Sequence, residues 1–312
     1  MVRSCPSNRR PSIRPPLFLC VVLLLVISLP VFAQTEATVS PVDTVHADGN
    51  RAMVMQPPPL KWHSMFTNIP GDWVRYGRTT FTVKNIPSIL GMGALTAALI
   101  ATDDATWKAS DKWYNSSSTV KETSDFFEYM GDGRPQFGLA GAFALWGFVA
   151  DDSRSLRTAS QLVEAILATG VVIQVLKHTT GRESPLVSTA PGGIWRFFPN
   201  QIEYHKHVPH YDAYPSGHIA TAMATVTVVA ENYPEWTWVR PVGYPIVALI
   251  GIAMANTGIH WYSDYPLGLA LGYSFGMLAA HPEPVAVNDD VPVSVLPLLS
   301  PYGAGIAVRI DL

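Results

Sequence analysis

A short turn with the composition of an anion site stands before an apolar stretch, Ile219 to Ala230, that has helical spacing. The turn is Tyr214-Pro215-Ser216-Gly217-His218. Ser216 is a favourable N-cap residue, so we expect a helix to begin here. A helix start offers unpaired N–H groups and a positive dipole end to an anion, and Gly217 allows close approach to the backbone. His218 adds a titratable group, although a capped helix with a chance histidine remains the alternative.

A second candidate group is His260 with Asp264, four residues apart in His260-Trp261-Tyr262-Ser263-Asp264. On a helix or helical turn, this spacing places both side chains on one face. A carboxylate bonded to one ring nitrogen fixes the tautomer and makes the other nitrogen a better base or nucleophile. The alternative is a structural His–Asp pair near a helix start.

Two bases, Lys177 and Arg182, end a long apolar segment that precedes both groups. Cations are favourable at a helix C-terminus, so solvated structural bases are the simple interpretation. Taken in order, however, two bases, an anion-ready helix start and an oriented histidine indicate a phosphate site.

A histidine-rich loop allows a different hypothesis. His205, His207, His210 and Asp212 have residue types and spacing that can bind zinc. The alternative is a polar loop beside the phosphate pocket, and the order of the other groups favours phosphate chemistry.

These residues resemble the three motifs of the type 2 phosphatidic acid phosphatase superfamily, which includes vanadium haloperoxidases and bacterial class A acid phosphatases. The family's first motif is a lysine, six residues and Arg-Pro, and here the segment from Lys177 ends in Ser184-Pro185. The second, Pro-Ser-Gly-His, is intact at 215–218. The third is Ser-Arg, five residues, a histidine, and an aspartate four further on, and here it runs from Ala253-Met254 to His260 and Asp264. The resemblance covers roughly residues 86–281.

Both phosphate-binding arginines of the family pattern are replaced. Ser184 stands in the first motif and Met254 in the third. Neither a hydroxyl nor a thioether replaces a bidentate guanidinium. We therefore expect Arg182, or Arg196 in the following loop, to supply the missing charge.

The resemblance implies a mechanism and its residues. His260 would attack phosphorus to form a phosphohistidine, Asp264 would orient its ring, and His218 would protonate the leaving group. The phosphate oxygens would be held by Lys177, Arg182 and the N–H groups of Ser216 and Gly217. No metal or other cofactor is expected. The chain would be a metal-independent phosphatase acting on a phosphate ester or pyrophosphate, with a lipid phosphate as the favoured substrate. A non-catalytic relative that binds an anionic headgroup or envelope partner, and a vanadate-dependent haloperoxidase, are the alternatives.

The elements that must position these residues read as helices. Apolar or amphipathic helical segments are expected at 86–102, 116–130, 136–150, 153–178, 244–259 and 265–280. These segments predict an all-α fold class with a short β-hairpin-like tail around Pro301-Tyr302-Gly303, and the resemblance implies that the helices form a PAP2-like helical bundle. The expected domains are a signal peptide at 1–33, a linker at 34–60, a phosphatase domain at 61–282 and a tail at 283–312.

Composition and the first segment indicate location. Arginines precede an apolar run from Leu17 to Val31, and Val31-Phe32-Ala33 has small residues at cleavage spacing, as in a secretory signal peptide. An uncleaved anchor is the alternative. Charged residues make up only 14% of the 312 residues and the net charge is -3, which argues against nucleic-acid binding. The apolar runs lie at or under the length needed to span a bilayer. They fit a membrane body or a soluble core, and we favour a membrane-embedded or membrane-associated protein exported to the periplasmic side of a bacterial envelope. Nothing in the sequence indicates an oligomeric state.

Overall fold

A computed structural model describes residues 63–282, together with the backbone of 293–300 and 303–310. The predicted signal peptide at 1–33 and linker at 34–60 lie outside the described residues. Contacts divide the chain into two units, Met1–Ala280 and His281–Leu312, and each is treated by itself.

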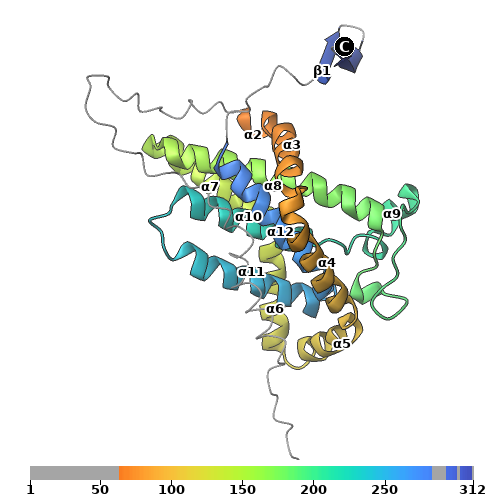
Figure 1. Cartoon of the computed structure of the whole chain (residues 1–312). Coiled ribbons are helices and arrows are strands. Elements are labelled where there is room, and N and C mark those ends of the chain that lie inside the picture. Colours follow the sequence, from red (N-terminus) through yellow and green to blue (C-terminus); the bar gives the residue numbers. More distant parts are fainter. Residues whose placement is uncertain (1–62, 283–292, 301–302, 311–312) are drawn as a thin grey trace, which may run out of the picture. The chain divides into compact units, whose positions relative to one another are not determined.

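The centre of the first unit is α10 (Gly217–Asn232), which packs against α8 (Ser153–Thr180), α11 (Val239–Asn256) and α12 (Tyr265–Ala280) (Figure 1). The contact of α10 with α12 is close because α12 presents glycine there. A Cβ on Gly272 would lie only 2.1 Å from the carbonyl oxygen of Ala220. Backbones therefore meet directly beneath the turn that carries His218.

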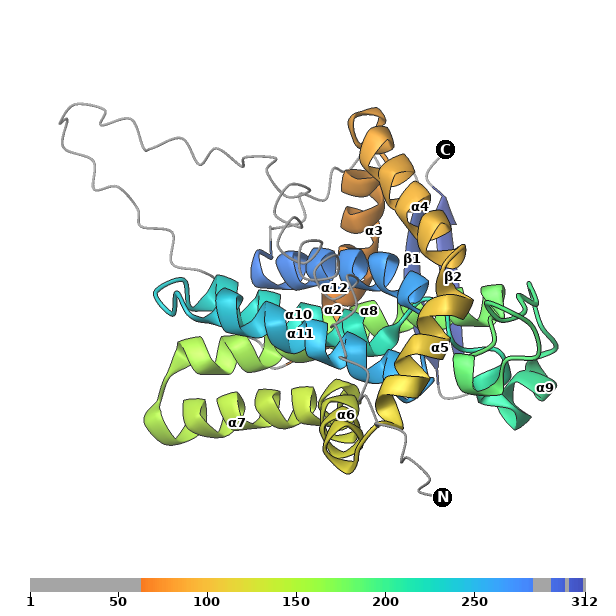
Figure 2. The ribbon, with the colours of Figure 1, turned by 90° about the horizontal axis from the view of Figure 1, so that it is seen from below.

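The remaining helices surround this centre. Figure 2 shows α7 running beside α8, with α6 next to it and α4 and α5 on another side. The longer ones are α3 (Ile69–Thr80), α4 (Ile86–Ile100), α5 (Asp103–Tyr114), α6 (Ser118–Gly131) and α7 (Arg134–Ala150). Short helices are α2 (Ser64–Thr67), η2 (Val83–Asn85), η3 (Pro185–Val187), α9 (Gln201–Lys206), η4 (Val208–His210) and η5 (Tyr262–Asp264). The predicted all-α fold class is confirmed.

Two of the longer helices were not expected from the sequence. Helix α3 lies in a stretch without clear period, and α5 begins at Asp103, which had been interpreted as the end of the preceding helix. Acidic residues favour a helix N-terminus, so Asp103-Asp104 both follows α4 and opens α5. Helix α11 also begins at Val239 instead of Tyr244 and contains Pro245.

The second unit contains a two-stranded antiparallel sheet, β1 (Val293–Ser300) and β2 (Gly303–Ile310). Val293 pairs with Ile310 and Ser300 with Gly303. The hairpin-like tail is thus confirmed, with strands longer than the alternating residues alone indicated.

Three helical segments among the described residues are long and apolar enough to cross a membrane: Val83–Ile100, Ser153–Thr180 and Val239–Asn256. The first has only 6% of its residues buried in the protein. On α7, Phe148 and Val149 are 77% and 75% exposed. Apolar surfaces of this kind mark contact with another apolar phase, and they support a membrane-embedded body.

Candidate active site

His218 and His260 meet at the centre of the candidate site. The ring centroids lie 5.3 Å apart, and Nδ1 of His218 is 3.1 Å from Nε2 of His260. His218 is the second residue of α10. His260 was expected on a helix, but it lies in the loop between α11 and η5. The loop brings it to the start of α10, so residues 42 positions apart share one hydrogen bond.

Asp264 stands behind His260 and links the second and third motifs. Its Oδ2 lies 3.4 Å from Nδ1 of His260 and accepts a hydrogen bond of 2.8 Å from the N–H of Trp261. Its backbone oxygen accepts from the N–H of Ser216 at 3.0 Å. The His260 contact is within ion-pair distance but lacks hydrogen-bond geometry, and such contacts often tighten only when substrate binds.

Arg182 has a different place from the one expected. It is wholly buried, and its terminal nitrogens donate to Asp264, Asp103, Ser263 Oγ and the oxygen of Gly192. Its guanidinium also lies 4.7 Å and 5.3 Å from the ring centres of Trp195 and Trp261. Only Nε lacks a partner among the described residues. The expectation that Arg182 holds phosphate is therefore corrected, because its terminal N–H groups already support Asp264.

Lys177 keeps a position from which it can reach a ligand. It lies in the last turn of α8 and is 6% exposed, and its Nζ lies 3.4 Å from Oδ2 of Asp212. A contact of this length is a weak hydrogen bond. Lys177 is consequently the site cation that an anion can recruit at the least cost.

The environment keeps both histidines neutral. Burial, together with the neighbouring His260 and Lys177, lowers the pKa of His218 to about 3. Burial and Lys177 likewise lower the pKa of His260 to about 3. Burial raises the pKa of Asp264 to about 6, although Arg182 and the Trp261 N–H oppose this shift. At neutral pH His260 therefore has an unprotonated nitrogen, and Asp264 is a carboxylate.

The two backbone donors expected at the helix start are not equivalent. The N–H of Ser216 is taken by Asp264, and its Oγ caps α10 by accepting from Ile219 at 3.4 Å. The expectation that Ser216 holds phosphate is thus corrected, while its predicted N-cap role is observed. Gly217, the first residue of α10, has no backbone acceptor for its N–H among the described residues and remains the candidate backbone donor.

Arg196, the second candidate for the missing charge, is also engaged. It donates to Oε1 of Glu183 at 2.8 Å and to the oxygen of His210 at 3.4 Å. Burial raises the pKa of Glu183, but the N–H groups of Thr189 and Ile194, together with Arg196, lower it to about 2 overall. Arg196 therefore neutralises a permanent carboxylate.

The two replaced motif positions are closed off. Ser184 is 4% exposed and donates its N–H to the oxygen of Pro209. Met254 is fully buried in an apolar cluster with Ile219 and Met223. The wall where the family pattern has an arginine is thus hydrocarbon and sulfur.

Asp103 is a site residue that sequence reasoning missed. It is fully buried, pairs with Arg182 and accepts from the hydroxyl of Ser263. Its only sequence signal was an acidic residue at the end of an apolar run. The contact joins positions 79 apart, which no local spacing reveals.

The zinc hypothesis for the histidine-rich loop is wrong. No group of three or more potential ligands converges among the described residues. His205 lies against His178 and Tyr204, whereas His210 faces Glu183.

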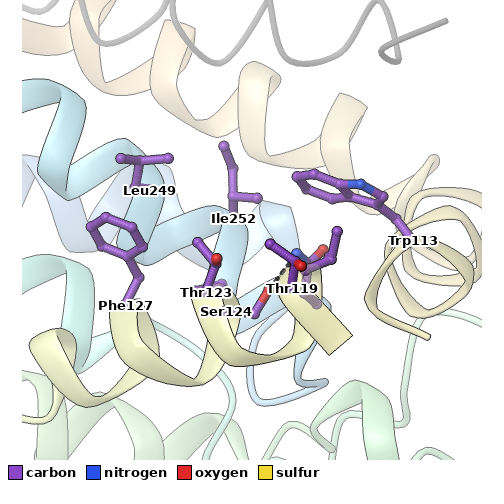
Figure 3. Close-up of a pocket in the computed structure, with 10 residues that line it drawn as sticks. Trp113, Thr119, Thr123, Ser124, Phe127, Leu249 and Ile252 are labelled. Atoms are coloured by element: carbon purple, nitrogen blue, oxygen red, sulfur yellow. Dashed lines mark hydrogen bonds between the residues drawn. The ribbon is translucent and has the colours of Figure 1, made fainter. Parts of the chain in front are cut away.

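A cavity of about 230 Å³ lies between α5, α6 and α11 (Figure 3). Its lining is mainly apolar, and it includes Ala253 and Asn256 from the third motif region. The loop that carries His260 therefore follows directly after a helix that lines the cavity.

Residues 158–284 match the model of the PAP2 superfamily. These residues are a PAP2 superfamily domain. The PAP2 domain contains Lys177, His218, His260 and Asp264, so the predicted family is confirmed.

Two individual proteins resemble the chain in part. A lipid A 1-phosphatase of Porphyromonas gingivalis is 37% identical over 68 residues, which are 22% of this chain and only 15% of that protein. The crystal structure of a transmembrane PAP2 type phosphatidylglycerolphosphate phosphatase from Bacillus subtilis superposes with a TM-score of 0.42 and 18% identity. That superposition covers 70% of this chain and 94% of the other.

Proposed function

We propose that the PAP2 domain is a phosphatase that hydrolyses a phosphate ester or pyrophosphate, with a lipid phosphate as its substrate class. The observation that carries this proposal is the contact between His218 and a neutral His260 backed by Asp264. Side chains then supply the nucleophile, the acid and the orienting carboxylate, so the proposed reaction needs no metal.

The reaction begins at Nε2 of His260. This nitrogen attacks phosphorus, an N–P bond forms, and the bond from phosphorus to the leaving oxygen breaks. Asp264 holds the ring and stabilises the positive charge that develops on it. His218 gives a proton to the leaving oxygen and then takes one from the water that hydrolyses the phosphohistidine. Such acid–base assistance is worth roughly 10²–10⁴-fold.

Binding of the substrate must break the hydrogen bond that joins the two histidines in the ligand-free protein. The 3.1 Å bond between the two histidines occupies Nε2 of His260, so the phosphoryl group has to separate the rings. A phosphate dianion also favours protonation of His218, because an opposite charge nearby raises the pKa of an imidazole. Substrate binding would thus create the acid that the free protein lacks.

The charge available to bind phosphate is small. Lys177 faces Asp212, and Arg182 faces Asp103 and Asp264. An uncompensated dianion in a partly dry pocket is costly. We infer that Lys177 leaves Asp212 to meet the phosphate, with the Gly217 N–H as a second donor.

The same scarcity of charge supports a second candidate function. With Ser184 and Met254 in place of arginines and Arg182 saturated, the domain would bind an anionic headgroup or an envelope partner without turnover. This is the alternative that the site's own residues favour, whereas a vanadate-dependent oxidation would need more oxyanion donors than the site presents.

Phosphate release by the purified protein tests the proposal. Phosphatidic acid and para-nitrophenyl phosphate are offered with and without EDTA, using His260→Ala as the matched control. We expect turnover that survives EDTA and vanishes in the variant. No release from either substrate would favour the binding function, and release abolished by EDTA would contradict the mechanism.

We further propose that the site faces the periplasmic side of a bacterial envelope. The arginine-rich start and Val31-Phe32-Ala33 support export. Mass spectrometry of the mature protein should find an N-terminus near Gln34. An intact Met1 would instead indicate an uncleaved anchor.

A further inference from the structure

The cavity between α6 and α11 has the character of a site for an apolar chain. Trp113, Phe127, Leu249 and Ile252 line it with aromatic and aliphatic surface (Figure 3). Leu249 is 40% exposed and belongs to a candidate membrane span, so the cavity borders the surface that lipid would cover. A chain can therefore enter it without crossing water.

One buried polar atom in this lining has no hydrogen-bond partner in the part of the chain that the structure describes. Asn256 is 1% exposed and donates its Nδ2 to Oγ of Ser124 at 3.0 Å. Its Oδ1 has no hydrogen-bond partner among the described residues. A buried acceptor without a donor costs roughly 1–3 kcal/mol, which a ligand O–H or N–H would recover.

Two of the three helices that line the cavity, α6 and α11, also reach His218. Gly131 ends α6 and Met254 lies on α11. A Cβ on Gly131 would lie 2.9 Å from Cε of Met254 and 3.3 Å from Cβ of His218. Phe127 and Leu249 lie about one helical turn from these contacts, so the cavity and His218 border the same α6–α11 interface.

We propose that this cavity binds the alkyl chain of the substrate whose phosphoryl group reacts at His260, and that the chain carries a hydroxyl or amide donor for Asn256. The inference rests on the proposed function and names the part of the substrate that the phosphate pocket does not recognise. Few cations lie around His260, so contacts with the phosphate contribute little affinity. Burial of the alkyl chain would supply the rest of the binding free energy.

The first test is a substitution at an exposed position that fills the cavity with a large side chain. Thr123 lies on the lining of α6 and is exposed, so Thr123→Trp fills the cavity with little risk to folding. Glu122→Trp places the same side chain on the same helix at an exposed position outside the lining. We measure KM for dodecyl phosphate and for para-nitrophenyl phosphate and compare their ratio.

The expected result is a roughly tenfold rise in the dodecyl to para-nitrophenyl KM ratio for Thr123→Trp, with the wild-type ratio retained by Glu122→Trp. An unchanged ratio in Thr123→Trp, or an equal change in both variants, would overturn the inference. For Asn256, at least one member of a hydroxydodecyl phosphate series should bind more tightly than dodecyl phosphate to wild type but not to Asn256→Leu. If wild type binds no hydroxydodecyl phosphate more tightly than dodecyl phosphate, the part of the proposal that gives the alkyl chain a donor for Asn256 is wrong.

A labelling experiment separates this inference from the proposed function. Dodecyl phosphate with a terminal diazirine is photolysed with wild type and Thr123→Trp, and labelled peptides are mapped by mass spectrometry. Labels on α6 and α11 in wild type that decline in Thr123→Trp support the chain site even where no phosphate is released. Turnover with labels elsewhere would leave the phosphatase proposal standing and overturn the chain site.

Discussion

The guanidinium of Arg182 is bonded to the carboxylate of Asp264, and both side chains are wholly buried. Asp264 uses its other oxygen to face Nδ1 of His260. In the proposed reaction, Arg182 would therefore act through Asp264. This relationship replaces the direct phosphate contact that the order of residues had indicated.

Exchange of this guanidinium tests its role. Arg182→Lys keeps the charge but loses the fork that reaches Asp103 and Asp264 together. We expect kcat to fall by about 10²-fold, the scale of a small misplacement of a catalytic group, with KM nearly unchanged. Arg154→Lys is the matched control, because Arg154 makes a comparable set of bonds to Glu235 and Asn232. A large rise in KM or in the inhibition constant of phosphate would restore Arg182 as a phosphate ligand.

The lowered pKa of His218 predicts how activity depends on pH. Because the pKa of His218 in the free protein lies far below 6.5, the protonated fraction of its imidazole rises about tenfold as pH falls from 8 to 7, where Asp264, with a pKa of about 6, is still a carboxylate. His260 stays neutral in this range, since its pKa is also lowered. We expect kcat/KM for an alkyl phosphate to rise as pH falls, more steeply than for para-nitrophenyl phosphate, whose leaving group needs less protonation. Equal slopes for the two substrates would argue against His218 as the acid.

The contact of Gly131 with the site predicts a packing effect. A Cβ at this position would approach Cγ2 of Ile250 at 2.7 Å and Cε of Met254 at 2.9 Å. Gly131→Ala should therefore lower the free energy of unfolding by about 1–3 kcal/mol and displace His218. Gly138→Ala on α7 is the control, because its Cβ would meet nothing within 4 Å. Thermal unfolding and kcat are measured together, and equal behaviour of the two variants would contradict the packing described here.

Local patterns in the sequence were sufficient for much of the fold. The start of α10 could be predicted because Ser216 is a good N-cap before an apolar run. The end of α8 could be predicted because Gly181 is a glycine, which readily adopts the left-handed conformation that it has there. Both features act within a few residues. The extent of α12 followed from its apolar composition in the same way.

Long-range pairing explains what the sequence did not reveal. Whether Arg182 faces phosphate or protein depends on Asp103 and Asp264, which are 79 and 82 positions away. The convergence of His218 and His260 was expected from the order of the motifs, yet the loop position of His260 depends on where α11 ends. Met254 was recognised as a departure, but its burial against Ile219 depends on tertiary packing.

The covalent intermediate is the central claim of this account. Wild type and His218→Ala are mixed with a ³²P-labelled para-nitrophenyl phosphate and quenched at alkaline pH, where phosphohistidine persists. Peptides are then mapped by mass spectrometry. We predict one phosphorylated site at His260, with greater accumulation in His218→Ala because the water that removes the phosphoryl group lacks its base. No phosphopeptide at His260 in a protein that releases phosphate would contradict the account.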